Sequence, residues 1–111
     1  MEINDYQISE VTVIALDGSI DALTAPGIAA HIGEVIRRGE IKLVADLSGV
    51  DYTSSAGLRV LLGAVKETRA QGGDLRLAEV QPDVMKVLKL SGFTNILKIY
   101  DRLDAAVASF S

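Results

Sequence analysis

The stretch DLSGVDYTSSAGLRVLL, residues 46–62, decides the fold, because a buried strand ends within it and a helix begins within it. The nearly continuous apolar run IKLVADL at 41–47 is typical of a central strand covered on both faces, as in parallel sheets. A polar turn is expected over 46–55. The helix that follows should begin at Ser55 and end near Ala70. Its apolar residues recur at helical spacing, at Leu58, Leu61, Leu62 and Val65.

The residues before this stretch predict a β-hairpin followed by a helix. Tyr6–Ser9 and the β-branched run Val11–Leu16 are expected to be strands joined by a tight turn at Ser9-Glu10. Asp17-Gly18 should end the second strand. A helix is then expected over Ala25–Arg38, with Thr24 before it and Gly39 after it. Its apolar face consists of Ile28, Ile32, Val35 and Ile36.

The residues after the deciding stretch continue the alternation of strands and helices. We expect strands over Leu75–Ala78 and Ile96–Tyr100, with a helix between them that begins at Pro82 and ends at Ser91-Gly92. A last helix should end near Phe110. The order is therefore β-β-α-β-α-β-α-β-α. It predicts an α/β fold with a mostly parallel mixed sheet, an N-terminal hairpin and about four helices.

Composition narrows the possible functions. A length of 111 residues fits one domain over 1–111. The net charge is −4 and no basic stripe is present, so we expect no nucleic-acid partner. The chain has no Cys and one His, which gives no ligand set for a metal. The acidic, polar N-terminus does not resemble a signal peptide, and no apolar run approaches a membrane span. We therefore expect a cytoplasmic protein that needs no cofactor and binds no membrane.

Ser55 stands at the start of a helix, where backbone N–H groups and the helix dipole favour negative charge. A phosphate there would add about −1.5 to −2 charges at pH 7. The fold should tolerate this charge, whereas a partner docked on the turn should not. The alternative interpretation is that Ser55 is only the helix N-cap, a role that stabilises a helix by about 1 kcal/mol.

The chain resembles the STAS domain family, named after sulfate transporters and anti-sigma factor antagonists. The resemblance rests on Gly18, Ile20 and Asp21, on DLSGV at 46–50, on SSAGL at 54–58 and on KVLKLSGF at 86–93. It covers essentially the whole chain, and the motifs are fairly specific because they occur in order at these spacings.

This resemblance implies a phosphorylation switch and not an enzyme. Family antagonists are phosphorylated on a Ser in an Asp-Ser-[Ser/Ala]-Gly-Leu motif, which places the acceptor on Ser55. Ser54 stands where the family has Asp, and it is the alternative acceptor. The unphosphorylated domain would bind an anti-sigma factor with serine kinase activity and so release a sigma factor. Phosphorylation would end the binding, and a PP2C-type phosphatase would reverse it.

Nothing in the sequence indicates an obligate dimer, so we expect a free monomer.

The predicted partner-binding residues follow the turn and the exposed face of the next helix. Gly63 has two interpretations, close approach of a partner backbone or close packing inside the domain. Asp21 has two as well, contact with the kinase or a structural carboxylate at a helix start. The full set is Asp21, Thr53, Ser54, Ser55, Arg59, Gly63 and Lys66.

Three alternative functions differ from this one in the residues that they require. A serine hydrolase needs a His base, and the only His, His31, is expected on the solvated flank of the first helix. A nucleotide-binding protein lacks a Gly-rich phosphate loop, although weak nucleotide binding at the Ser55 turn stays an alternative. The third is a STAS scaffold that shares the fold but is no longer phosphorylated. This alternative stays open because Ser54 replaces the Asp of the family motif.

Overall fold

A five-stranded mixed sheet forms the centre of the molecule. The computed structural model describes all residues, 1–111. The strands lie in the order β1-β2-β3-β4-β5. The first two, β1 (Glu2–Ile8) and β2 (Val11–Ile20), are antiparallel. The other three are parallel to β2, namely β3 (Lys42–Thr53), β4 (Asp74–Ala78) and β5 (Ile99–Tyr100).

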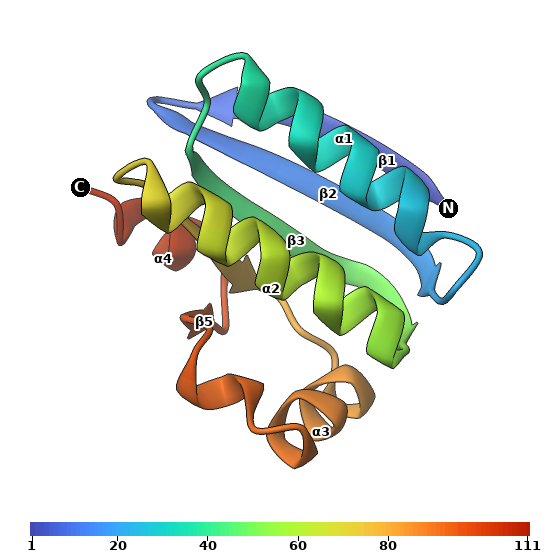
Figure 1. Cartoon of the computed structure of the whole chain (residues 1–111). Coiled ribbons are helices and arrows are strands. Elements are labelled where there is room, and N and C mark those ends of the chain that lie inside the picture. The colour runs from blue at the N-terminus through green and yellow to red at the C-terminus, as the bar shows by residue number, and fades with distance from the viewer.

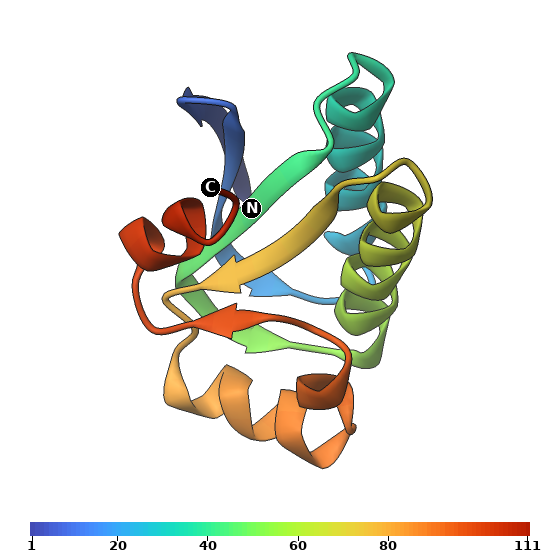
Figure 2. The ribbon, with the colours of Figure 1, turned by 90° about the vertical axis from the view of Figure 1, so that its left-hand side faces the viewer.

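Helices cover both faces of this sheet. The two longest, α1 (Ala25–Arg37) and α2 (Ser55–Ala70), lie side by side on one face, and α4 (Leu103–Ala108) lies on the other (Figures 1 and 2). Between β4 and β5 the chain forms α3 (Pro82–Leu90) and a 3₁₀ turn, η1 (Phe93–Asn95). The order of elements and the mostly parallel sheet confirm the predicted α/β fold.

The main core lies between the sheet and the pair α1 and α2. Apolar side chains from alternate positions of the central strands meet the apolar stripes of these helices, as the helical and strand periods of the sequence require. Val84 and Leu88 of α3 complete this core. The fully buried large side chains include Ile14, Leu16 and Leu43. A smaller cluster under α4 is formed by Val11, Val44, Ala78 and Ala106.

The strands differ from the prediction mainly in length. Strand β1 begins at Glu2 instead of Tyr6, since it pairs with β2 along its whole length. Strand β2 continues past Asp17-Gly18 to Ile20 through two register irregularities, with Gly18 at φ +121°. At the other end, β5 holds only Ile99 and Tyr100 instead of Ile96–Tyr100, since only these two residues pair with β4.

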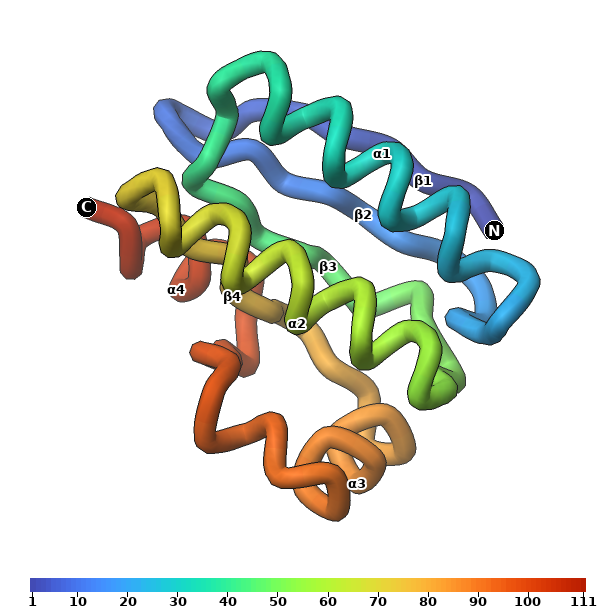
Figure 3. Tube along the Cα trace, viewed as in Figure 1, coloured from blue at the N-terminus to red at the C-terminus, as the bar shows by residue number.

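The polar turn predicted over 46–55 was wrong, because β3 continues to Thr53. Beyond Asp46, β3 extends past its pairing with β4 and pairs only with β2. This projecting end is half covered. Leu47, Val50 and Thr53 are buried, while polar residues between them face solvent. The extension carries the start of α2 to the far end of β2, beside the loop that leads into α1 (Figure 3).

Candidate functional site

The junction between β3 and α2 contains the predicted phosphorylation site. Thr53 ends the strand and is buried, Ser54 has extended backbone dihedrals, and Ser55 is the first helical residue. The N-cap of α2 is therefore Ser54 and not Ser55, which corrects the interpretation of Ser55 as a cap. Neither serine side chain makes a capping hydrogen bond. The presence of Ser55 is thus not explained by a capping role.

The two candidate acceptors differ sharply in their exposure. The backbone N–H of Ser54 donates to the carbonyl oxygen of Ile20 at 2.8 Å, which ties this residue to the end of β2. The Ser54 hydroxyl oxygen is buried and has no hydrogen-bond partner. Ser55 is exposed. Of the two candidate acceptors, only Ser55 is exposed in the folded chain.

Gly57 allows α2 to start directly against β2. A Cβ atom at this position would overlap Cγ2 of Ile20 and would lie 2.5 Å from Oγ1 of Thr53. Both neighbours are buried and belong to paired strand ends. Since no side chain fits between them, Gly at position 57 fixes the distance between the first turn of α2 and the sheet.

Asp21 lies beside this junction because Ile20 and Thr53 are partners in the parallel pair of β2 and β3. Its Oδ1 accepts hydrogen bonds from the backbone N–H groups of Leu23 at 2.9 Å and Thr24 at 3.0 Å. These bonds, with the one from Thr24 the larger cause, hold the pKa of the Asp21 carboxyl below its usual value. Asp21 thus shapes the loop before α1 and at the same time borders the phosphorylation turn.

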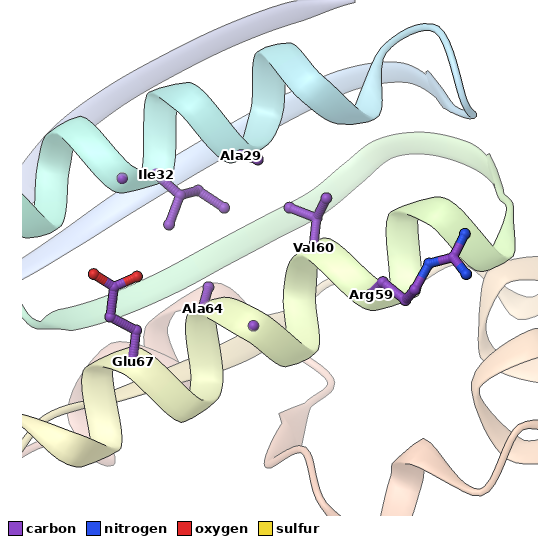
Figure 4. Close-up of a pocket in the computed structure, with 8 residues that line it drawn as sticks. Ala29, Ile32, Arg59, Val60, Ala64 and Glu67 are labelled. Carbon is purple, nitrogen blue, oxygen red and sulfur yellow. The ribbon is translucent and has the colours of Figure 1, made fainter.

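A shallow groove runs between α1 and α2, and we call it the α1–α2 groove (Figure 4). Its volume is about 310 Å³. The lining residues are Ala29, Ile32, Gly33, Arg59, Val60, Gly63, Ala64 and Glu67. A second hollow of about 360 Å³ continues it toward the Ser55 turn and shares Ala29, Arg59 and Val60 with it. The sequence analysis did not predict the α1 half of this groove. The small residues Ala29 and Gly33, one turn apart on α1, are the sequence feature that could have indicated it.

Gly63 faces open space in the groove. A Cβ built on it would meet no atom within 4 Å. Close packing inside the domain therefore does not explain this glycine, and close approach of a partner backbone stays a prediction. Arg59 lines the same groove one turn earlier, whereas Lys66 is exposed on α2 but does not line it.

The cations without an ion pair are concentrated on one part of the molecule. The N-terminal and α4 sides use theirs in ion pairs, such as Arg38 with Glu40 and Arg76 with Asp74. The remaining ones lie on α2, on α3 and just before β5. They are Arg59, Lys66, Lys86, Lys89 and Lys98. Of these five, Arg59 lies one helical turn beyond Ser55 and so leaves one unpaired positive charge near the Ser55 turn, in a chain whose net charge is −4.

Other chemistry receives no support from the geometry. His31 is half-buried and bonds through Nε2 to Asp5 of β1, instead of lying on a solvated flank as predicted. It is held on the β1 side of α1, so it is not paired with either serine. No group of three or more His, Asp or Glu side chains is placed to hold a metal ion. None of the helices has the length and apolar character required to cross a bilayer.

Similarity to known proteins extends over almost the whole chain. Residues 2–106 match the family model of the STAS domain. BtrV of Bordetella bronchiseptica, named as a candidate anti-sigma factor antagonist, is 34% identical over 110 residues, which cover 99% of this chain and 95% of BtrV. The crystal structure of an anti-sigma factor antagonist from Mycobacterium paratuberculosis has a TM-score of 0.89 at 27% identity and covers 97% of this chain and 92% of that one.

The Bacillus cell-fate determinant SpoIIAA, solved in its phosphorylated form, has the same fold. Its TM-score is 0.74 at 22% identity, covering 99% of this chain and all 100% of that one. The sheet order, the β3–α2 junction and the match over residues 2–106 lead to one assignment. The chain belongs to the STAS domain family.

Proposed function

We propose that this chain is an anti-sigma factor antagonist that is switched by phosphorylation of Ser55. In its unphosphorylated form it binds an anti-sigma factor with serine kinase activity and thereby releases the sigma factor. Relatives along the whole chain carry the name of such antagonists. The observation that carries the proposal is the exposed Ser55 hydroxyl at the start of α2, next to an open groove. The chain acts here as a binding module and a kinase substrate.

The proposed switch is a phosphoryl transfer onto Ser55. Its Oγ attacks the γ-phosphorus of ATP, and the new O–P bond forms as the bond to ADP breaks. The hydroxyl proton passes to a base of the kinase. The product carries about −1.5 to −2 additional charges at pH 7. A partner whose carboxylates meet the free cations of α2 and α3 would be repelled by this phosphate. The added charge would therefore destabilise the complex far more than it destabilises the fold.

Choice of Ser55 over Ser54 is supported by burial. Phosphorylation of the Ser54 hydroxyl would require the junction to open, because that oxygen is enclosed and its residue is bonded to Ile20. Partner contact is proposed for the surface formed by Asp21, Thr53, Ser54, Ser55, Arg59, Gly63 and Lys66. Thr53 and Ser54 would act mainly by holding this surface in place, since Thr53 is buried.

The remaining partners follow from the same proposal. A PP2C-type phosphatase would hydrolyse the phosphoserine and return the domain to its binding form. The circuit would operate in the cytoplasm, where the sigma factor works, and the free domain would be a monomer. No nucleic acid, membrane or cofactor takes part in this scheme.

Phosphate incorporation tests the proposal directly. The protein and its Ser55→Ala and Ser54→Ala variants would be incubated with the cognate anti-sigma factor and ATP, followed by intact-mass and fragment mass spectrometry. One phosphate on Ser55, retained in Ser54→Ala and absent from Ser55→Ala, is expected. A phosphate on Ser54 would move the acceptor, and an unmodified protein that still binds the anti-sigma factor would identify a constitutive scaffold.

Binding of the variants supplies the second measurement. Ser55→Asp places a permanent charge at the turn and should weaken binding to the anti-sigma factor by about tenfold or more, which equals about 1.4 kcal/mol. Ser55→Asn, of nearly the same size, is the matched neutral control and should bind more tightly than Ser55→Asp. Equal affinities would show that charge at this turn does not control the complex.

A further inference from the structure

Arg59 is a free cation one helical turn beyond Ser55. Both residues are exposed, and Arg59 takes part in none of the ion pairs of the structure. Its guanidinium extends toward the end at which α2 begins (Figure 4). This direction follows from helix geometry, since Cα–Cβ bonds tilt toward the N-terminus and side chains cover the preceding turn. Arg59 is therefore aimed at the turn that carries the proposed phosphoserine.

Spacing and chemistry suit an ion pair between these two positions. Residues four apart are neighbours on a helix surface, and an anion that precedes its cation is the favoured order. A guanidinium matches phosphate oxygens with two parallel N–H donors, which a lysine ammonium cannot do. The carboxylate beside the turn, Asp21, accepts bonds from the backbone of its own loop. Glu67, the one carboxylate that lines the α1–α2 groove, lies two turns farther along α2.

Arg59 is also part of the predicted docking surface. It lines the α1–α2 groove and the hollow that continues it toward the turn, together with Val60 and Ala29. In the unmodified protein the guanidinium is thus available to a carboxylate of a bound partner. The same group cannot make full contact with a phosphate behind it and a carboxylate in front of it.

We propose that phosphorylated Ser55 captures Arg59 in an ion pair across one turn of α2 and so withdraws this cation from the α1–α2 groove. The proposal rests on phosphorylation of Ser55 as its starting point. The switch then has two electrostatic parts. The phosphate repels an acidic partner, and the Arg59 guanidinium that attracted this partner is no longer free to contact it. Both parts act without any rearrangement of the backbone.

The proposal can be tested without a kinase or a partner. Phosphoserine would be placed at position 55 by genetic code expansion, and the second pKa of its phosphate would be measured by ³¹P NMR titration. Pairing with Arg59 favours the dianion, so Arg59→Gln should raise this pKa by about 0.15–0.4, which is the stabilisation expected for one helix-surface ion pair converted to pKa. Arg59→Lys should give a value between those of the native sequence and Arg59→Gln.

Lys42→Gln is the matched control, since it removes one positive charge as Arg59→Gln does. Lys42 starts β3 and lies at the opposite end of that 12-residue strand from the Ser55 turn. It should leave the phosphate pKa unchanged. Equal pKa values in Arg59→Gln and the native sequence, or an equal shift in Lys42→Gln, would overturn the ion pair. Because the phosphoserine is incorporated during translation and needs no kinase, failure here is separate from failure of kinase phosphorylation.

Discussion

Two glycines of the same helix lie in opposite surroundings, so replacing each with alanine should change stability in opposite directions. Gly63 lies in the middle of α2, and a Cβ there would meet nothing within 4 Å. Gly57 lies in the first turn, where a Cβ would overlap Ile20 and crowd Thr53. The pair isolates packing from helix propensity, because both substitutions add the same methyl group to the same helix.

The size of each effect can be worked out from these surroundings. Gly→Ala in a helix interior gains about 0.8–1 kcal/mol, so Gly63→Ala should raise the free energy of unfolding by nearly this amount and the Tm by about 3–5 °C. For Gly57→Ala a smaller gain in the first turn is opposed by about 1–3 kcal/mol of overpacking. Ile20 is branched and 1% exposed, so it has little room to move. We expect a net loss of about 1–2 kcal/mol.

Urea unfolding followed by circular dichroism measures both free energies under one set of conditions. The double variant is informative as well, since two distant effects in one helix should add to within about 0.5 kcal/mol. A Gly63→Ala variant less stable than the native protein would refute the open surroundings of Gly63. A Gly57→Ala variant at least as stable as the native protein would refute the close contact between α2 and β2.

Three other substitutions test separate parts of the structure. Ser54→Ala should change the free energy of unfolding by less than about 0.5 kcal/mol, because the Ser54 hydroxyl is buried and makes no capping hydrogen bond. Loss of a working N-cap would instead cost about 1 kcal/mol. Urea titration measures this difference, and a loss of the full amount, about 1 kcal/mol, would contradict the geometry. His31 lies against Asp5 and holds the pKa of that carboxyl below 3.8, so its contribution is present above the unfolded pKa and is lost as pH falls through the lower folded pKa. Asp5→Asn should therefore reduce stability at pH 5–7 and flatten its acid dependence below about pH 4, in urea titrations from pH 3 to 7; an unchanged profile would exclude this role. Arg76 donates to the carbonyl oxygen of Ser109 at 2.7 Å, so Arg76→Ala should cost about 2 kcal/mol and speed amide exchange in α4; unchanged exchange there would show that the contact does not hold the helix.

The α1–α2 groove joins the proposed function to the fold. The two helices that build it also cover the main core, so packing fixes the side chains on their buried faces. Only the side chains on their outer flanks can be chosen to suit a partner. Small residues on α1 and Gly63 on α2 keep the groove open, and Arg59 supplies its charge near the turn. In the proposed function, a partner that enters this groove would contact the Ser55 turn and the core helices together, and a charge at Ser55 would then act across the interface.

The sequence by itself determined the order of elements and singled out the Ser55 turn as the candidate site. Helical and strand periods are local properties, so the stripes of Ile28 and Leu58 and the apolar run at 41–47 predicted their elements without knowledge of the packing. Glycines at 39 and 92 marked helix ends, and both have positive φ. Motifs in order along the chain indicated the STAS family, which the family match confirms.

Only the tertiary structure decided which side chains face solvent at the site and what surrounds them. Two adjacent serines are equivalent in sequence, yet one is enclosed against Ile20 and the other is exposed. Strand β3 extends through a polar segment because β2 pairs with it there, a contact made by residues more than thirty positions apart. Gly57 and Gly63 are likewise the same residue in the same helix. Burial and hydrogen bonding depend on what lies across from a residue, and that is set by the packing of the whole chain.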